Sequence, residues 1–256
     1  MQSNDFDNVP YYEALAGAYD LFFDDLEQNM QDEGRWLERL LRAHGVCTVL
    51  DASCGAGRQA IPLSERGFAV TAADPSKAML RRAAAAAAAR HLEISFIAAP
   101  FSELPDRVPH CFDAVIALGN GLCHLQRPAD IQAALAALHG CCLAGGLCLV
   151  GIKDFEQVRA VRQRVHYRGT KEEGTARTLM FELWDFEDPL LACTAFVLQR
   201  PDLTSPWNTH TASTREYMLE ETELARLASS AGFGDISRLH HHREAIFLLR
   251  PKTKRV

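Results

Sequence analysis

The chain has 256 residues, of which 48% are hydrophobic and 23% charged, and its formal net charge is -6. A chain of this size buries a core without disulfides or metals, and its composition excludes the fibrous and disordered classes. The negative charge argues against a nucleic-acid partner, because such binding depends on a concentrated basic field. No apolar run reaches the roughly 18 residues of a membrane helix, so we expect no membrane partner.

The start of the chain and the cysteines indicate the compartment. The first residues are acidic and lack the basic and apolar regions of a secretory signal, which predicts a cytoplasmic protein. The eight cysteines lack the paired spacing of zinc or redox motifs, so we expect reduced thiols and no metal site. The three histidines at 240–242 do not alter this, because neighbouring side chains on a strand point to opposite faces.

The first part of the chain predicts two helices followed by a strand, a glycine loop and another helix. Apolar residues recur at three- and four-residue steps over 12–44, which is the helical period, and Gly45 ends the second helix. Residues 46–50 form a short buried strand that leads through a loop into a helix ending near residue 66. A second strand covers 68–73, and Ser76 can cap the alanine-rich helix after it.

The remaining elements predict a parallel sheet and a late antiparallel insertion. Further strands are expected at 94–98, 112–118 and 147–152, with a helix at 128–139. Short apolar strands that alternate with helices are typical of an α/β fold with both sheet faces covered. After residue 153 the pattern changes: 177–184 and 192–200 alternate apolar and polar residues and predict a hairpin that turns at 185–189. A helix at 220–231 and a strand at 245–249 then return to the main sheet.

The glycine loop carries most of the chemical information. Such a loop presents backbone N–H groups to a ligand at the carboxyl edge of a parallel sheet. Dinucleotide loops read G-x-G-x-x-G, but here Asp51 ends the strand and Cys54 stands where the first glycine would fall. A carboxylate at this position suits a ligand with an ammonium group, and Asp74, which ends the next strand, suits a ribose. The structural alternative is that both aspartates are only caps.

With these residues the sequence resembles class I S-adenosylmethionine-dependent methyltransferases, and more narrowly the glycine and sarcosine N-methyltransferase group. The resemblance runs from about residue 44 to 152, in the family's order. Its main motifs are Val49-Leu-Asp-Ala-Ser-Cys-Gly-Ala-Gly57, Asp74-Pro-Ser-Lys-Ala-Met-Leu80, Phe112-Asp-Ala-Val-Ile-Ala-Leu-Gly-Asn120 with His124-Leu125, and Gly145-Gly-Leu-Cys-Leu-Val150.

The resemblance implies a Rossmann-like, seven-stranded, mostly parallel sheet with helices on both faces. We expect a single domain over 1–256. Its parts are an N-terminal helical cap (1–44), a cofactor-binding core (45–152), an antiparallel substrate lid (153–219), and the final helix and strand of the core (220–256). The implied cofactor is S-adenosyl-L-methionine, with S-adenosyl-L-homocysteine as product.

The resemblance also implies cofactor-binding residues, most of them at the strand ends. The loop would hold the methionine end, Asp74 the ribose and Met79 the adenine, and Leu118 would present its backbone near the sulfonium. The full expected set is Tyr19, Asp51, Ser53, Gly55, Gly57, Asp74, Pro75, Met79, Pro100, Phe101 and Leu118. Pro100 and Phe101 depart from the family pattern, which has an aspartate before an aromatic residue, so the adenine amino group must bond to backbone or to Glu103.

For the substrate, Asn120 matches the family's orienting asparagine, although it could instead cap the next helix. His124 lies one helical turn further on, and it and Tyr19 are the candidate catalytic residues; His124 could also be a structural histidine. Trp184, Arg215 and Tyr217 are candidates to line the substrate pocket. The arginine that holds a substrate carboxylate in glycine-methylating relatives has no match. Arg168, Arg177, Arg200 and Arg215 all fall in weakly similar sequence.

The sequence thus predicts an S-adenosylmethionine-dependent methyltransferase that acts on a nitrogen of a small molecule, either an amine or an N-heterocycle. Two alternatives stay open: a small-molecule O-methyltransferase, and a non-catalytic S-adenosylmethionine-binding regulatory protein. A nicotinamide-dependent oxidoreductase is disfavoured by Asp51 and Cys54 in the loop. The oligomeric state is not predicted.

Overall fold

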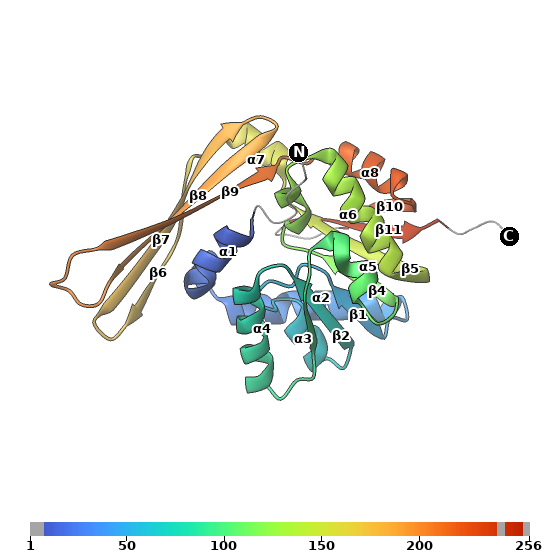
Figure 1. Ribbon diagram of the computed structural model, residues 1–256, viewed down its shortest axis with the longest axis horizontal. Coiled ribbons are helices and arrows are strands. Elements are labelled where there is room, and N and C mark those ends of the chain that lie inside the picture. Colours follow the sequence, from blue (N-terminus) through green and yellow to red (C-terminus); the bar gives the residue numbers. More distant parts are fainter. Residues whose placement is uncertain (1–7, 240–243, 253–256) are drawn as a thin grey trace.

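The computed structural model describes residues 8–239 and 244–252. The described chain forms a main body around one sheet, and a second sheet projects from it (Figure 1). Within the described ranges, no helix is both long and apolar enough to cross a membrane.

The main sheet has seven strands in the described part of the chain, in the order β10-β11-β5-β4-β1-β2-β3. Neighbouring strands from β3 to β5 pair in parallel, whereas β11 is antiparallel to both of its neighbours. The strands are β1 (Thr48–Asp51), β2 (Ala69–Asp74), β3 (Ser95–Ala98), β4 (Phe112–Ala117), β5 (Cys142–Ile152), β10 (Phe233–Leu239) and β11 (Ala245–Pro251). This confirms the predicted Rossmann-like, mostly parallel sheet. The sequence pattern did not indicate β10, whose exposed residues outnumber its buried ones.

Helices cover both faces of this sheet (Figure 1). They are α2 (Leu26–Ala43), α3 (Ala60–Glu65), α4 (Lys77–Ala89), α5 (Leu104–Arg107), α6 (Pro128–Cys141) and α8 (Glu221–Ser230). Strand residues alternate between two buried clusters: Val49 packs with α2 and α3, and Leu50 packs with α6 and α8. This alternation is the period of a strand, so both faces become apolar and the strand ends are left to carry polar groups.

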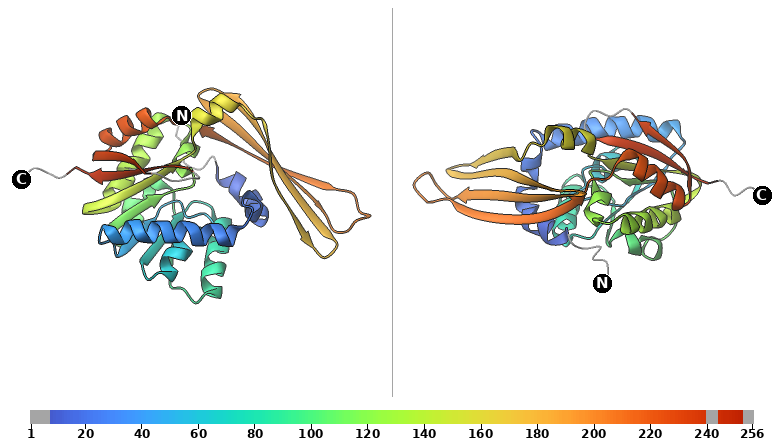
Figure 2. Two further views of the ribbon diagram at one scale, coloured as in Figure 1. Left: turned by 180° about the vertical axis from the view of Figure 1, so that it is seen from behind. Right: turned by 90° about the horizontal axis from the view of Figure 1, so that it is seen from above.

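The N-terminal segment crosses from the body to the projecting sheet. It consists of α1 (Val9–Leu15), the 3-10 helix η1 (Ala16–Phe22) and then α2, whose first turn is capped by Asp25 accepting the Gln28 backbone N–H at 2.9 Å. Tyr11, Leu15 and Leu21 pack with Met180 and Val197 of the projecting sheet. Figure 2 shows the segment between that sheet and the body. The N-terminal segment therefore lies between the projecting sheet and the main body and contacts the projecting sheet.

The projecting sheet, which we call the lid, has the strand order β6-β7-β8-β9 over the described residues and is antiparallel throughout. Its strands are β6 (Val165–Glu173), β7 (Ala176–Glu187), β8 (Leu190–Arg200) and β9 (Asn208–Tyr217), and α7 (Phe155–Val161) precedes them. The predicted hairpin of β7 and β8 is confirmed. Its turn is tighter than expected, because only Asp188 and Pro189 lie between the strands.

Short 3-10 helices follow the ends of β3 and β4. Of these, η2 (Phe101–Glu103) leads into α5, and η3 (Gly121–Leu125) precedes α6. Together with the loop after β1, they bring polar residues to the carboxyl edge of the parallel strands, where ligands bind in open α/β sheets.

Candidate active site

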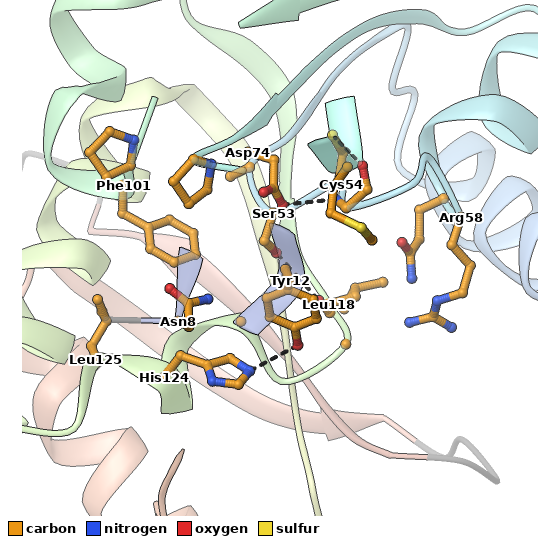
Figure 3. Close-up of a pocket in the computed structure, with 18 of the residues that line it drawn as sticks. Asn8, Tyr12, Ser53, Cys54, Arg58, Asp74, Phe101, Leu118, His124 and Leu125 are labelled. Atoms are coloured by element: carbon orange, nitrogen blue, oxygen red, sulfur yellow. Dashed lines mark hydrogen bonds between the residues drawn. The ribbon is translucent and has the colours of Figure 1, made fainter. Parts of the chain in front are cut away.

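A cavity lies at the carboxyl ends of β1, β2 and β4, beneath the N-terminal segment (Figure 3). Its empty volume is about 740 Å³, part of it open to solvent, which is within the range of small-molecule sites. Ten of the expected residues line it: Tyr19, Ser53, Gly55, Asp74, Pro75, Met79, Pro100, Phe101, Leu118 and His124. In Figure 3, Phe101 and Arg58 lie at opposite ends of the cavity, with Asp74 and Ser53 between them.

The loop after β1 holds its shape through glycines and the next strand. Gly55 has a positive φ of 51°, and its N–H donates to Oδ2 of Asp74 at 2.9 Å. Gly57, with φ of 87°, does not line the cavity; a Cβ there would lie 2.8 Å from Ile61. Gly57 therefore lets α3 pack closely against the loop, and it does not line the cavity as the resemblance led us to expect.

Asp51 is a buried carboxylate behind the loop. Its exposed fraction is 1%, and neither of its oxygens has a hydrogen-bond partner of normal geometry among the described residues. Burial raises the pKa of Asp51 to about 7, although the Ser53 backbone N–H and Arg58 oppose this. A buried carboxylate without a partner is costly, and an ammonium group beside it would remove that cost. Although Asp51 does not itself line the cavity, its neighbours Ala52 and Ser53 do, so its unpartnered carboxylate fits the amino end of S-adenosylmethionine.

Asp74 forms the wall where β2 ends. Its Oδ1 accepts the Ser76 N–H and its Oδ2 accepts the Gly55 N–H, both at 2.9 Å. Burial raises the pKa of Asp74 to about 6 against these two bonds. Each carboxylate oxygen can accept a further bond, and the side chain lines the cavity, so two adjacent hydroxyl groups of a ribose could donate to it. It is Ser76 that caps α4, by accepting the Met79 N–H at 3.2 Å.

One end of the cavity is apolar, with Pro75, Met79, Pro100 and Phe101 as its walls. Such a lining suits a flat aromatic ring such as adenine. Glu103 does not line the cavity and pairs with Arg107 instead, so it is not placed to bond an adenine amino group.

A second cavity opens between the main body and the lid, with an empty volume of about 1010 Å³ on the same measure. It shares four lining residues with the first cavity: Tyr12, Tyr19, Arg58 and Gly119. The two cavities therefore border each other next to the end of β4, where Ser53 Oγ donates to the Leu118 carbonyl at 3.3 Å. Aromatic rings of the N-terminal segment form one wall and lid residues form the other.

Buried ion pairs line the second cavity. Lys153 donates to both carboxylate oxygens of Glu216 at 2.6 Å, and Arg168 donates to Glu182 through two nitrogens, one of them at 2.9 Å. Although burial opposes it, Arg168 holds the pKa of Glu182 below its usual range. Glu182 also accepts the Tyr11 hydroxyl. Glu182 is thus ionised at neutral pH, and both acids are engaged by a cation of the cavity.

Asn120 faces the second cavity from the end of β4. Its backbone is left-handed, with φ of 70°, and its Oδ1 accepts the Lys153 backbone N–H at 3.0 Å. The side chain does not cap η3. The buried Nδ2 has no hydrogen-bond partner in the described part of the chain, so an N–H donor is left for a molecule in the cavity.

His124 lies at the border of the first cavity. Its Nε2 shares a hydrogen bond of 3.0 Å with the Tyr12 hydroxyl, and its Nδ1 lies 3.4 Å from Thr214 Oγ1. Burial lowers the pKa of His124, although Glu216 nearby raises it. The imidazole is therefore neutral at pH 7, and its Nε2 can accept the hydrogen bond of the Tyr12 hydroxyl, which lines both cavities.

The other three substrate candidates do not reach either cavity. Trp184 is buried within the lid, and its indole N–H donates to Glu182 at 3.2 Å. Arg215 is exposed and pairs with Glu187, and the Tyr217 hydroxyl donates to Glu223 at 3.0 Å. On β9, Glu216 faces the cavity, so its neighbours Arg215 and Tyr217 face away.

Several residues of the cavities were not predicted. Those with polar or charged side chains include Tyr12, Arg58, Lys153, Glu182, Glu216 and Glu244. Weaker similarity to the family continues through Lys153-Asp-Phe-Glu156 and Glu182-Leu-Trp-Asp-Phe186, and it was the one available signal for Lys153 and Glu182. The histidines at 240–242 lie outside the described residues.

Comparisons with known proteins agree with this geometry. A sequence profile described as "Methyltransferase domain" matches residues 49–146. The chain is 33% identical over 157 residues to a glycine/sarcosine N-methyltransferase of Parasynechococcus marenigrum (strain WH8102), covering 60% of this chain and 55% of that protein. It is 31% identical over 156 residues to the glycine N-methyltransferase of Homo sapiens, covering 56% and 53%. The matched segment thus spans about half the length of these relatives.

Solved structures share the whole fold. Streptomyces venezuelae DesVI superposes with a TM-score of 0.78 at 16% identity, over 93% of this chain and 98% of that one. The sugar N-methyltransferase KedS8 from Streptoalloteichus sp ATCC 53650 gives 0.75 at 18% identity, over 91% and 93%. These matches show a methyltransferase domain over residues 49–146, in a chain that has the fold of S-adenosylmethionine-dependent methyltransferases.

Proposed function

We propose that the protein transfers a methyl group from S-adenosylmethionine to a nitrogen atom of a small-molecule amine. The observation that carries this proposal is the pair of adjoining cavities. One has the lining expected for the cofactor, the other is polar and charged, and they share Tyr12, Tyr19, Arg58 and Gly119. A group held in the first cavity borders a group held in the second, so proximity and orientation can supply much of the rate.

In this proposal the first cavity holds the cofactor. Asp51 pairs with its amino group, Asp74 accepts its ribose hydroxyls, and Met79 and Phe101 enclose its adenine. Tyr19, Ser53, Gly55, Pro75, Pro100 and Leu118 complete the wall. When bound, S-adenosylmethionine supplies an electrophilic methyl group.

The second cavity orients the acceptor. Nδ2 of Asn120 donates to it, while the Lys153 backbone N–H fixes the asparagine side chain through Oδ1. The lid and the N-terminal aromatic residues exclude water from the acceptor. His124 is neutral and holds the Tyr12 hydroxyl at the border of the cavities, so this pair can take up a proton there.

Nitrogen is favoured over oxygen as the nucleophile because the relatives in sequence are named N-methyltransferases. The O-methyltransferase and the non-catalytic regulatory protein are not favoured by the comparisons. A test is the formation of S-adenosylhomocysteine when the protein is mixed with S-adenosylmethionine and a panel of matched amines and alcohols. Turnover with amines supports the proposal. Turnover with alcohols alone indicates oxygen, and cofactor binding without turnover across the panel indicates the regulatory alternative.

Asn120→Gly should lower kcat/KM for the amine by roughly 10- to 100-fold, because a buried donor to the acceptor is lost. Glycine accepts the left-handed backbone of residue 120, so the fold should be kept. Calorimetry should give a cofactor Kd within about twofold of the wild-type value. His91→Gly is the matched control, since exposed His91 is also left-handed, with φ of 56°, and lines neither cavity. A loss of cofactor affinity in Asn120→Gly would contradict the assigned role.

A further inference from the structure

The carboxylate of Glu244 projects into the second cavity from the residue just before β11. It is partly buried, and its Oε2 accepts the Gly119 backbone N–H at 3.0 Å, at the border that both cavities share. Gly151 on β5 makes room for it, because a Cβ at that position would lie 2.7 Å from Cδ of Glu244. Two backbone positions thus hold this carboxylate beside the end of β4.

The charges around Glu244 do not balance within the described residues. Each of the three cations that line the cavity is bonded to a carboxylate of its own: Arg58 to Glu33, Lys153 to Glu216 and Arg168 to Glu182. Glu244 forms no ion pair with a described cation and is the fourth acid of the set. Glu244 is therefore the one acid of this set without a cation of its own among the described residues, so its ionised form carries an unbalanced negative charge.

The proposal rests on the function proposed above and names its substrate class. We propose that the ionised carboxylate of Glu244 binds the protonated amino group of the methyl acceptor and then takes up its proton. In that step one N–H bond breaks, its electron pair stays on nitrogen, and the proton passes to Oε1 of Glu244, because Oε2 already accepts from Gly119. The neutral nitrogen then carries the lone pair that methyl transfer needs, and the carboxyl group later releases its proton to solvent.

The same charge balance disfavours acceptors with a free carboxylate. Arg168 and Lys153 are each held by two hydrogen bonds to a glutamate, so neither is available in the described cavity to bind a substrate carboxylate. An α-amino acid would bring a second unpaired negative charge beside Glu244, and burying such a charge is costly. The acceptor class is therefore a cationic amine without a carboxylate.

Groups on α2, on η3 and in the loops after β1 and β4 lie around Glu244 and affect its pKa. Burial raises its pKa to about 7, with Glu33 on α2 acting in the same direction, and Arg58 and the Gly119 N–H act against it. Cys123 on η3 is also within electrostatic reach. At pH 7 the cofactor-free protein is thus partly protonated at this site. Binding an ammonium group should release that proton, because the cation favours the ionised carboxylate.

The test is calorimetric binding of benzylamine, benzyl alcohol and phenylglycine to the protein saturated with S-adenosylhomocysteine. In the wild type we expect benzylamine to bind roughly 10- to 100-fold more tightly than the other two, since a charged hydrogen bond is gained. In Glu244→Gln we expect the affinity for benzylamine to fall to the affinity for benzyl alcohol. Titrations in two buffers of different ionisation enthalpy should show proton release at pH 7 in the wild type and none in Glu244→Gln.

Glu187→Gln is the control variant, because Glu187 is an exposed lid residue paired with Arg215 and should behave as wild type. An unchanged Kd for S-adenosylhomocysteine shows that Glu244→Gln is folded. Persistence of both the amine preference and the proton release in Glu244→Gln overturns the role of Glu244, and equal binding of phenylglycine and benzylamine to the wild type overturns the substrate class. Wild-type protein that methylates none of a broad amine panel refutes the proposed function itself, which is a different outcome.

Discussion

Asp51→Asn should stabilise the cofactor-free protein above neutral pH and, at the same time, remove most of its affinity for S-adenosylmethionine. Asp51 is fully buried, its oxygens have no partner of normal geometry among the described residues, and its pKa is raised to about 7. A raised carboxylate pKa means that the folded state binds more protons than the unfolded state between pH 4 and pH 7. The free energy of unfolding contributed by this group therefore falls as pH rises through that window.

Asparagine removes this dependence because it has no charge to bury. We expect the gain in unfolding free energy to grow from less than about 1 kcal/mol at pH 4 to about 2–4 kcal/mol at pH 8. Urea unfolding of both proteins at several pH values measures it. Calorimetry should show cofactor affinity lowered by roughly 100-fold, since a buried ion pair with the amino group is lost. A variant that is less stable at pH 8, or that binds the cofactor as tightly as wild type, would argue that Asp51 is only a structural residue.

Asp74→Asn should raise the Kd for S-adenosylmethionine by roughly 100-fold, through the loss of charged hydrogen bonds to two ribose hydroxyls. The side chain also accepts the backbone N–H groups of Gly55 and Ser76, so part of any effect could come from the loop. Calorimetry with S-adenosylmethionine and with methionine separates the two contributions. Loss of the ribose bonds should weaken the binding of S-adenosylmethionine alone, because methionine has no ribose. A disordered loop should weaken the binding of both ligands.

Asp113→Asn provides the matched control for this variant. Asp113 also accepts two backbone N–H groups, from Cys47 at 3.0 Å and Thr48 at 2.8 Å, but it lies at the amino end of β4 and lines neither cavity. In both variants an amide nitrogen replaces an oxygen acceptor, and only Asp74→Asn should lose cofactor affinity. Equal affinity losses in the two variants would mean that Asp74 acts through the fold.

The first cavity was largely predictable because its chemistry is local in sequence. Asp51 and Asp74 end neighbouring parallel strands, and the carboxyl ends of such strands meet at one edge of the sheet. The sequence pattern and the order of the motifs were therefore sufficient to predict that the loop, Met79, Phe101 and Leu118 line the same cavity. Gly57 does not line the cavity, because a pattern that contains a glycine does not show whether a ligand or a neighbouring side chain such as Ile61 lies against it.

The second cavity could not be predicted in the same way, because its residues are brought together by tertiary packing. Glu244 reaches Gly119 across 125 residues, and Arg58 pairs with Glu33 on another element. On β9 the alternation of faces decides which side chain points inward, and an error of one residue exchanges Glu216 for Arg215. Trp184 lies on the same face of β7 as Glu182 and donates a hydrogen bond to its carboxylate, but only Glu182 lines the cavity.

The central claim is that a nitrogen atom receives the methyl group. The most direct test is nuclear magnetic resonance of a reaction that contains S-adenosylmethionine labelled with carbon-13 in its methyl group and a nitrogen-15-labelled amine without a carboxylate. We predict that the labelled methyl signal moves from the sulfonium to a new resonance that shows one-bond coupling to nitrogen-15, and that this signal is absent without the protein. A methyl signal that stays on the sulfonium across an amine panel, or that appears on oxygen of a matched amino alcohol, would contradict the account.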